Sequence, residues 1–275
     1  MRRLLGTVAI FLAAVLTFGF LLLPIVAIFA QTSPGNLLEQ LSNPVVVDAL
    51  VVSLETSAIA QAVVLLFGTP TAYLLASRRF PGRALLITLV ELPLVLPPAV
   101  AGLGLLVAFG RNGLLGSTFE VFGLSIPFTQ TAVTLAVIFV ASPLYLRQAI
   151  AAFEGVDSNL VAASRTLGAG STRTFFRVIM PLARAGLAAG FALALARGLG
   201  EFGATMMFAG SLQGVTQTLP LAIYAEFDRN FDATLAMGAL LVVISAALLL
   251  TLKLSVLWQA SRQSSRSRSG LLSWS

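Results

Sequence analysis

The sequence predicts an all-α membrane protein with six transmembrane helices and with both termini in the cytoplasm. Hydrophobic residues make up 57% of the 275 residues and charged residues only 10%, whereas soluble domains contain about 25% charged residues. A helix that crosses a bilayer core of ~30 Å needs about 20 mainly apolar residues. Six stretches are long enough, at approximately 4–30, 46–76, 84–109, 129–152, 182–209 and 232–258.

The basic residues give the orientation. With the N-terminus inside, the cytoplasmic segments hold all but three of the 17 lysines and arginines; the exceptions are Arg111, Arg229 and Arg197. Cytoplasmic loops carry an excess of Lys and Arg, so both termini are expected to be cytoplasmic. Residues 1–260 are expected to form a single transmembrane domain, and residues 261–275 a basic, disordered cytoplasmic tail. The high pI then reflects topology and contact with anionic membrane lipid, and no nucleic acid is expected as a partner.

The first stretch begins with two arginines and resembles a signal peptide. Its apolar run is longer than the ~7–15 residues of a signal sequence, so we expect a retained first helix. Several of the six stretches are longer than the minimum, which permits tilt without fixing an angle.

Prolines and glycines interrupt the third stretch, which contains Pro93, Pro97, Pro98, Gly102 and Gly104. Proline removes an amide donor and clashes with the preceding helical turn. In lipid such a break survives only where protein or a water-filled cavity satisfies the backbone. We expect the broken segment to face the protein interior, near a pathway or an oligomer interface; the alternative is a kinked helix with no role in transport.

The fifth stretch carries two charges, Arg197 and Glu201, four residues apart on one helical face. One interpretation is a self-compensating ion pair; the other places Arg197 beside a translocation path, where it attracts an oxyanion. The glycines around these residues allow close backbone approach under either interpretation. The residues predicted to line a pathway or an interface are Arg197, Gly200, Glu201, Thr205, Glu91 and Pro97.

The longest cytoplasmic connection, residues 157–181, is too polar to enter the membrane. Asp157 or Ser158 can cap a short helix that runs to Leu167, because a side-chain oxygen accepts the first free amide protons. Gly168 then ends this helix, since glycine tolerates the left-handed conformation.

A second short helix is expected after this glycine, with Phe175 and Phe176 on its apolar side and Arg173 outside. Pro181 marks the point at which the chain returns to the membrane. Two short amphipathic helices around a glycine form a rigid projection that is suited to docking into a groove on a partner.

This connection resembles the conserved cytoplasmic loop of ABC importer permeases, with the pattern Glu-Ala-Ala, three residues, Gly, nine residues, Ile-x-Leu-Pro. Here Ala163 and Ser164 stand at the two Ala positions, Gly168 at the Gly and Pro181 at the Pro, whereas Ala162 replaces the Glu. In that family the loop couples the permease to its ATPase subunit, and residues 157–181 are called the coupling loop from here on. The resemblance implies these contact residues: Ala163, Ser164, Arg165, Leu167, Gly168, Ala169, Arg173, Phe176 and Pro181.

A second resemblance concerns the cargo. The runs GLGEFGAT, TLPLAIY and ELPLVLPPAVAGLGLL are similar to the molybdate permease branch, which is shared in part with tungstate and sulfate permeases, over residues 45 to 250. The resemblance implies a homodimer in a bacterial or archaeal inner membrane, two cytoplasmic ATPase subunits and an external oxyanion-binding protein. Tungstate or sulfate is the alternative cargo.

The available chemistry excludes several functions. The chain has no His, no Cys and a single lysine, Lys253. It therefore lacks the Gly-Lys-Ser/Thr triplet of an ATP-binding loop, and any ATP and Mg are expected on a partner chain. No catalytic, cofactor or metal site is expected in this chain. A secondary transporter would show paired half-helices in two repeats, and we find no convincing repeat; an intramembrane enzyme would need an acidic or serine centre, and no such motif is evident.

Overall fold

The fold is taken from a computed structural model, which describes the backbone of residues 2–271 and the side chains of residues 6, 7, 10–251 and 254. All regular secondary structure within this part of the chain is helical. Five helical segments are long and apolar enough to cross a membrane: Ile10–Gln31 of α1 (Arg2–Gln31), α3 (Pro44–Ser77), α7 (Gln130–Glu154), the continuous run Ser171–Leu199, and Phe231–Thr251 of α13 (Phe231–Leu271). The first, second, fourth and sixth predicted spans are confirmed.

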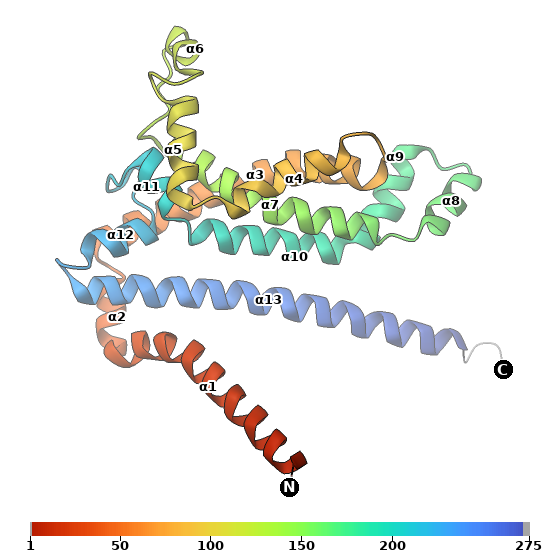
Figure 1. The fold of residues 1–275 in the computed structure, drawn as a ribbon, viewed down its shortest axis with the longest axis horizontal. Helices are drawn as coiled ribbons and strands as arrows, with labels where there is room; N and C mark the ends of the chain where they lie inside the picture. Colours follow the sequence, from red (N-terminus) through yellow and green to blue (C-terminus); the bar gives the residue numbers. More distant parts are fainter. Residues whose placement is uncertain (1, 272–275) are drawn as a thin grey trace.

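The centre of the bundle is formed by α3, α7 and α10 (Met180–Leu199), which lie side by side in Figure 1. Small residues bring these helices together around one large side chain, Tyr145, which is 1% exposed. A Cβ on Gly68 would lie 3.0 Å from the Tyr145 ring, and one on Gly190 would lie 3.3 Å from it. The Tyr145 hydroxyl lies 2.6 Å from Thr69 Oγ1. Such close packing is what associates helices in lipid, where the hydrophobic effect between them is lost.

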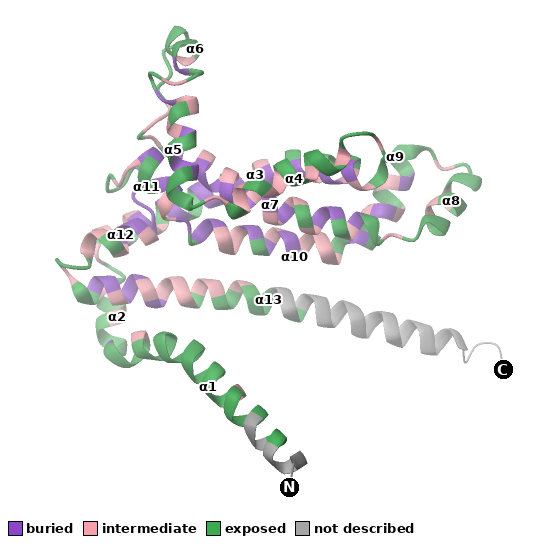
Figure 2. Cartoon of the chain, viewed as in Figure 1, coloured by how far each residue is buried: buried purple, intermediate pink, exposed green. Residues whose placement is uncertain are grey.

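Two long helices lie at the edge of this bundle (Figure 1). α13 runs beside α10 and α12 (Leu219–Glu226), whereas α1 diverges from the bundle and contacts mainly the start of α13. None of the best apolar window of α1 is buried, and Figure 2 shows its described surface as exposed. In a membrane this surface faces lipid or another subunit. α2 (Pro34–Gln40) joins α1 to α3.

The third predicted span, residues 84–109, is two helices rather than one. α4 (Arg83–Val95) and α5 (Pro98–Phe109) meet at 113°, and Pro97 and Pro98 stand at the break. The predicted interruption is thereby confirmed, and the described part of the chain has five candidate single spans, or six if this bent pair counts as one. α5 and the following α6 (Gly116–Val121) project away from the bundle (Figure 1).

The fifth predicted span, residues 182–209, is also interrupted, which the sequence analysis did not predict. α10 ends at Leu199, and α11 (Gly203–Ala209) begins after a break at residues 200–202. Phe202 has φ −125° and ψ −56°, outside the helical region. At the other end of the chain α13 continues to Leu271, whereas the sequence predicts a disordered tail over 261–275; residues 272–275 lie outside the described part.

Candidate functional site

The coupling loop begins with the predicted helix. α8 (Ser158–Thr166) is capped by Asp157, whose carboxylate accepts the Asn159 amide proton at 2.8 Å. Gly168 has φ +80°, and the amide of the next residue, Ala169, donates to the Ser164 carbonyl at 3.1 Å. The cap at 157 and the glycine stop at 168 are therefore confirmed.

One contact joins the helices within the coupling loop, and a second set of contacts fixes the loop to the bundle. The hydroxyls of Ser164 and Thr174 lie 3.1 Å apart and join α8 to α9 (Ser171–Thr174). The Phe175 ring packs on Tyr73 of α3, with centroids 4.7 Å apart, and on Phe153 of α7 at 6.2 Å. Tyr73 and Phe153 also meet edge to face at 5.5 Å. Aromatic rings prefer edge-to-face and offset arrangements of this kind. These ring contacts anchor the loop at the cytoplasmic ends of two spans.

The second half of the loop differs from the prediction. α9 continues through a π-helical turn, Phe175–Ile179, directly into α10, so Pro181 lies inside a continuous helix. In the π turn the Met180 amide donates to the Phe175 carbonyl, five residues back. This wider turn lets the chain pass Pro181, which has no amide proton, without a break. The prediction of a separate second short helix is therefore wrong, whereas the return to the membrane at Pro181 stays a prediction.

The outer side of the coupling loop is exposed and partly apolar. Leu167 is 88% exposed and Phe176 is 63% exposed, so the prediction that Phe176 lies on the packed side is wrong. Ala163, Arg165, Gly168, Arg173 and Pro181 are also exposed, whereas Ser164 and Ala169 are half-buried. Large apolar side chains in this setting mark a surface that another protein covers.

Under the role that the resemblance implies for the coupling loop, Gly168→Pro should weaken attachment of the ATPase about tenfold, the equivalent of about 1.4 kcal/mol. Proline requires φ near −65°, whereas Gly168 has φ +80° and its amide donates to the Arg165 carbonyl at 2.9 Å. Gly170→Pro is the matched control, because Gly170 already has φ −65°. Co-purification of the ATPase with each membrane-inserted variant measures the effect. Equal ATPase recovery with both variants would contradict the role assigned to the turn.

The second predicted site is the charge pair at the end of α10. Arg197 Nη1 lies 2.6 Å from Glu201 Oε2, and Glu201 Oε1 accepts the Ala204 amide proton at 2.7 Å. The Glu201 side chain is 1% exposed and that of Arg197 is 32% exposed. The predicted ion pair is confirmed. It does not lie within a regular helix as expected: it bridges the end of α10 to the first turn of α11, where a carboxylate near free amide groups is favourable.

The breaks of the third and fifth stretches meet at this point. A Cβ on Gly203 would lie 2.7 Å from Pro98 Cβ, and one on Gly102 would lie 2.6 Å from the Ala204 carbonyl oxygen. Hence α5 and α11 cross with backbones in direct contact. We call Arg197, Glu201, Gly203, Pro98 and Gly102 the helix-break junction.

The remaining predicted pathway residues lie at different places. Glu91 of α4 faces Arg147 of α7 at 3.7 Å, apart from the helix-break junction. Pro97 precedes α5 and is exposed, as is Gly200. Thr205 is fully buried in α11, and its hydroxyl has no hydrogen-bond partner within the described residues. The structure therefore groups Arg197 with Glu201 but not with Glu91.

Sequence reasoning missed the residues that hold the coupling loop in place. Tyr73 and Arg83 come from segments distant in sequence, whereas their partners Phe153 and Glu154 lie directly before the loop. The Arg83 Nε also donates to the Leu75 carbonyl at 2.6 Å. The only signal in the sequence is that aromatic and charged residues end the second and fourth apolar stretches.

Comparison with known proteins adds the family. The model of the binding-protein-dependent transport system inner membrane component matches residues 68–265. The molybdenum transport system permease protein ModB of Mycobacterium tuberculosis is 42% identical over 245 residues, which cover 88% of this chain and 91% of that protein. ModB of Escherichia coli K12 is 42% identical over 223 residues, covering 81% and 96%. The sulfate transport system permease protein CysW of Synechococcus elongatus is 38% identical over 195 residues, covering 71% and 68%.

Solved structures agree on the fold. A chain of a bacterial alginate ABC transporter, crystallised with an alginate pentasaccharide-bound periplasmic protein, aligns with a TM-score of 0.69 at 16% identity, covering 91% of this chain and 93% of that one. The chain therefore belongs to the multi-pass inner-membrane permeases of binding-protein-dependent ABC importers, non-catalytic translocation subunits that work with an ATPase and a binding protein.

Proposed function

We propose that this chain is the permease of a molybdate importer and that two copies form the translocation pathway. The 42% identity to molybdenum permeases over 88% of the chain is the observation that carries the choice of cargo. The external binding protein captures the oxyanion, the ATPase docks on the coupling loop, and this chain alternates between outward and inward access.

The geometry supports this division of labour. The coupling loop presents exposed apolar side chains at one end of the bundle, at Leu167 and Phe176. The acidic side chains at the opposite end, Glu39, Asp48, Glu120, Glu226, Asp228 and Asp232, repel a free anion. Delivery by a binding protein avoids this repulsion. Sulfate is the second candidate cargo, supported by the 38% identity to a sulfate permease.

The test is ATP hydrolysis by the purified complex in liposomes, with the cognate binding protein loaded in turn with molybdate, tungstate or sulfate. We expect molybdate to stimulate hydrolysis together with uptake, and sulfate to do neither. Stimulation by sulfate alone would replace the proposed cargo. The mass of the complex by light scattering tests the second part of the proposal, since one copy of this chain per complex would exclude the homodimer.

A further inference from the structure

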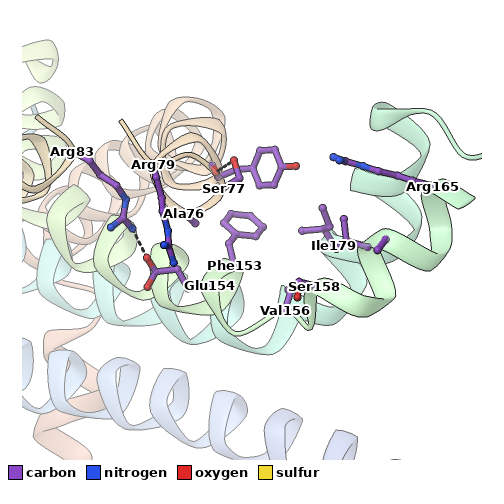
Figure 3. A pocket seen from close by; sticks show the side chains of 13 residues that line it. Ala76, Ser77, Arg79, Arg83, Phe153, Glu154, Val156, Ser158, Arg165 and Ile179 are labelled. Atoms are coloured by element: carbon purple, nitrogen blue, oxygen red, sulfur yellow. Dashed lines mark hydrogen bonds and ion pairs between the residues drawn. The ribbon is translucent and has the colours of Figure 1, made fainter. Parts of the chain in front are cut away.

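A pocket of about 880 Å³ lies behind the coupling loop, between the ends of α3 and α7 and the inner side of α8 (Figure 3). Its floor is apolar and includes Phe153, Val156 and Ile179. Its rim is basic, with Arg79 and Arg83 from the α3–α4 connection and Arg165 from α8. The pocket thus joins an apolar floor at the ends of membrane spans to a positive rim.

The rim has an excess of positive charge. Its three arginines face one acidic lining residue, Glu154, which is already paired with Arg83. Within the described part of the chain, Arg79 and Arg165 form no ion pair with an acidic residue. Figure 3 shows Arg79 reaching toward the Arg83–Glu154 pair and Arg165 extending over the pocket from the other side. Each of these two guanidinium groups is available to bind an anionic group in the pocket.

The pocket and the ATPase-docking surface are on opposite sides of α8. The residues of α8 that line the pocket are Ser158, Val161, Ala162 and Arg165, which share one helical face at spacings of three and four. Leu160, which is 48% exposed, lies on the opposite face of α8, and Leu167, which is 88% exposed, directly follows the helix. An ATPase that covers the outer face therefore leaves the pocket open to another ligand.

We propose that this pocket binds the headgroup of an anionic phospholipid from the cytoplasmic leaflet. A single inorganic oxyanion would occupy a small part of 880 Å³ and would gain nothing from an apolar floor. A phospholipid offers both a phosphate for Arg79 and Arg165 and apolar glycerol and acyl groups for the floor. Basic pockets between transmembrane helices on the cytoplasmic side suit such headgroups. The lipid would brace α8 against α3 and α7.

Because residue 162 is alanine, the positive charge of this site is not offset by a carboxylate at that position. The family pattern places Glu at this position, and residue 162 lines the pocket in this chain. A carboxylate there would cancel part of the positive charge that Arg79 and Arg165 provide. The absence of the pattern's Glu at position 162 therefore favours binding of an anion in this pocket. Ala162→Glu should weaken lipid binding.

The experiment is native mass spectrometry of the complex of this chain with its ATPase, titrated with phosphatidylglycerol or with phosphatidylcholine. We expect selective retention of phosphatidylglycerol. Arg79→Gln, Arg165→Gln and Ala162→Glu should each lower its apparent affinity about fivefold, because one basic residue near an anionic membrane contributes about that factor. Arg78→Gln is the matched control, since Arg78 is an exposed neighbour that does not line the pocket.

Several outcomes would overturn the proposal. One is an equal loss of lipid with Arg78→Gln and Arg79→Gln, which would reduce the effect to general surface charge. A second is displacement of the lipid by millimolar molybdate or phosphate with the same dependence on Arg79 and Arg165, which would assign the site to a soluble oxyanion. A third is lipid binding by the permease alone that disappears in the complex, which would assign the pocket to the ATPase. None of these results depends on which oxyanion is transported.

Discussion

Leu167→Ser should abolish most coupled transport while leaving the permease folded. Leu167 is 88% exposed, so its side chain contributes little to the stability of the isolated chain. Burying a leucine at an interface contributes roughly 2 kcal/mol, which is equivalent to about thirtyfold in affinity. We therefore expect the ATPase to dissociate from the variant about thirtyfold more readily. Titration of the purified ATPase onto the permease in nanodiscs measures this directly.

Leu114→Ser provides the matched control. Leu114 is 83% exposed, and it lies between α5 and α6, at the end of the bundle remote from the coupling loop. The same substitution there should leave the affinity for the ATPase unchanged. If the two variants bind the ATPase equally well, Leu167 is not part of the docking surface.

Arg197→Met should destabilise the permease by about 3 kcal/mol, because it leaves a buried carboxylate without its partner. Glu201 would retain only the Ala204 amide, in a side chain that is 1% exposed. Glu201→Gln should cost less, about 1 kcal/mol, since the amide oxygen can still accept that proton and Arg197 is partly exposed. The double variant Arg197→Met, Glu201→Gln should recover part of the loss, because it buries no unpaired charge. Thermal unfolding in detergent tests this order of stability.

Arg184→Met controls for loss of a positive charge on α10, since Arg184 is exposed and forms no ion pair among the described residues. Equal destabilisation by Arg184→Met and Arg197→Met would contradict the structural role of the pair. Transport by the double variant then separates the two interpretations of these charges. A stable variant that does not transport would place the charges on the oxyanion path, whereas a stable variant that transports would assign them to folding.

The successful predictions rest on local rules. Asp157 and Gly168 bound α8 because a cap and a left-handed glycine act within a few residues of themselves. The break in the third stretch was readable because Pro97 and Pro98 lack amide protons. The ion pair between Arg197 and Glu201 could be predicted because the two residues are only four positions apart in the sequence.

The failures concern features that local rules do not determine. Gly198, Gly200 and Gly203 permit a break but do not require one, so the sequence of residues 182–209 does not by itself separate a continuous span from one that ends at Leu199. That break depends on α11 packing against α5, through Gly102 and Gly203. Phe176 was misplaced because the π turn rotates the face of the helix that follows Thr174. The contact of Phe175 with Tyr73 spans about a hundred residues of sequence.

α9, the π turn and α10 form one continuous helix, so a movement at the cytoplasmic end of the fifth span is transmitted along the helix to its other end. Its 29 residues, from Ser171 to Leu199, are helical throughout and trace a path of about 44 Å at 1.5 Å per residue. One end is clamped by the Ser164–Thr174 contact, and the other end carries Arg197. A tilt of about 5° of α10, whose 20 residues span about 30 Å at 1.5 Å per residue, displaces its far end by about 3 Å. In the proposed arrangement, a small movement of the ATPase on the coupling loop would be transmitted, without an intervening loop, to the place where the two broken spans cross.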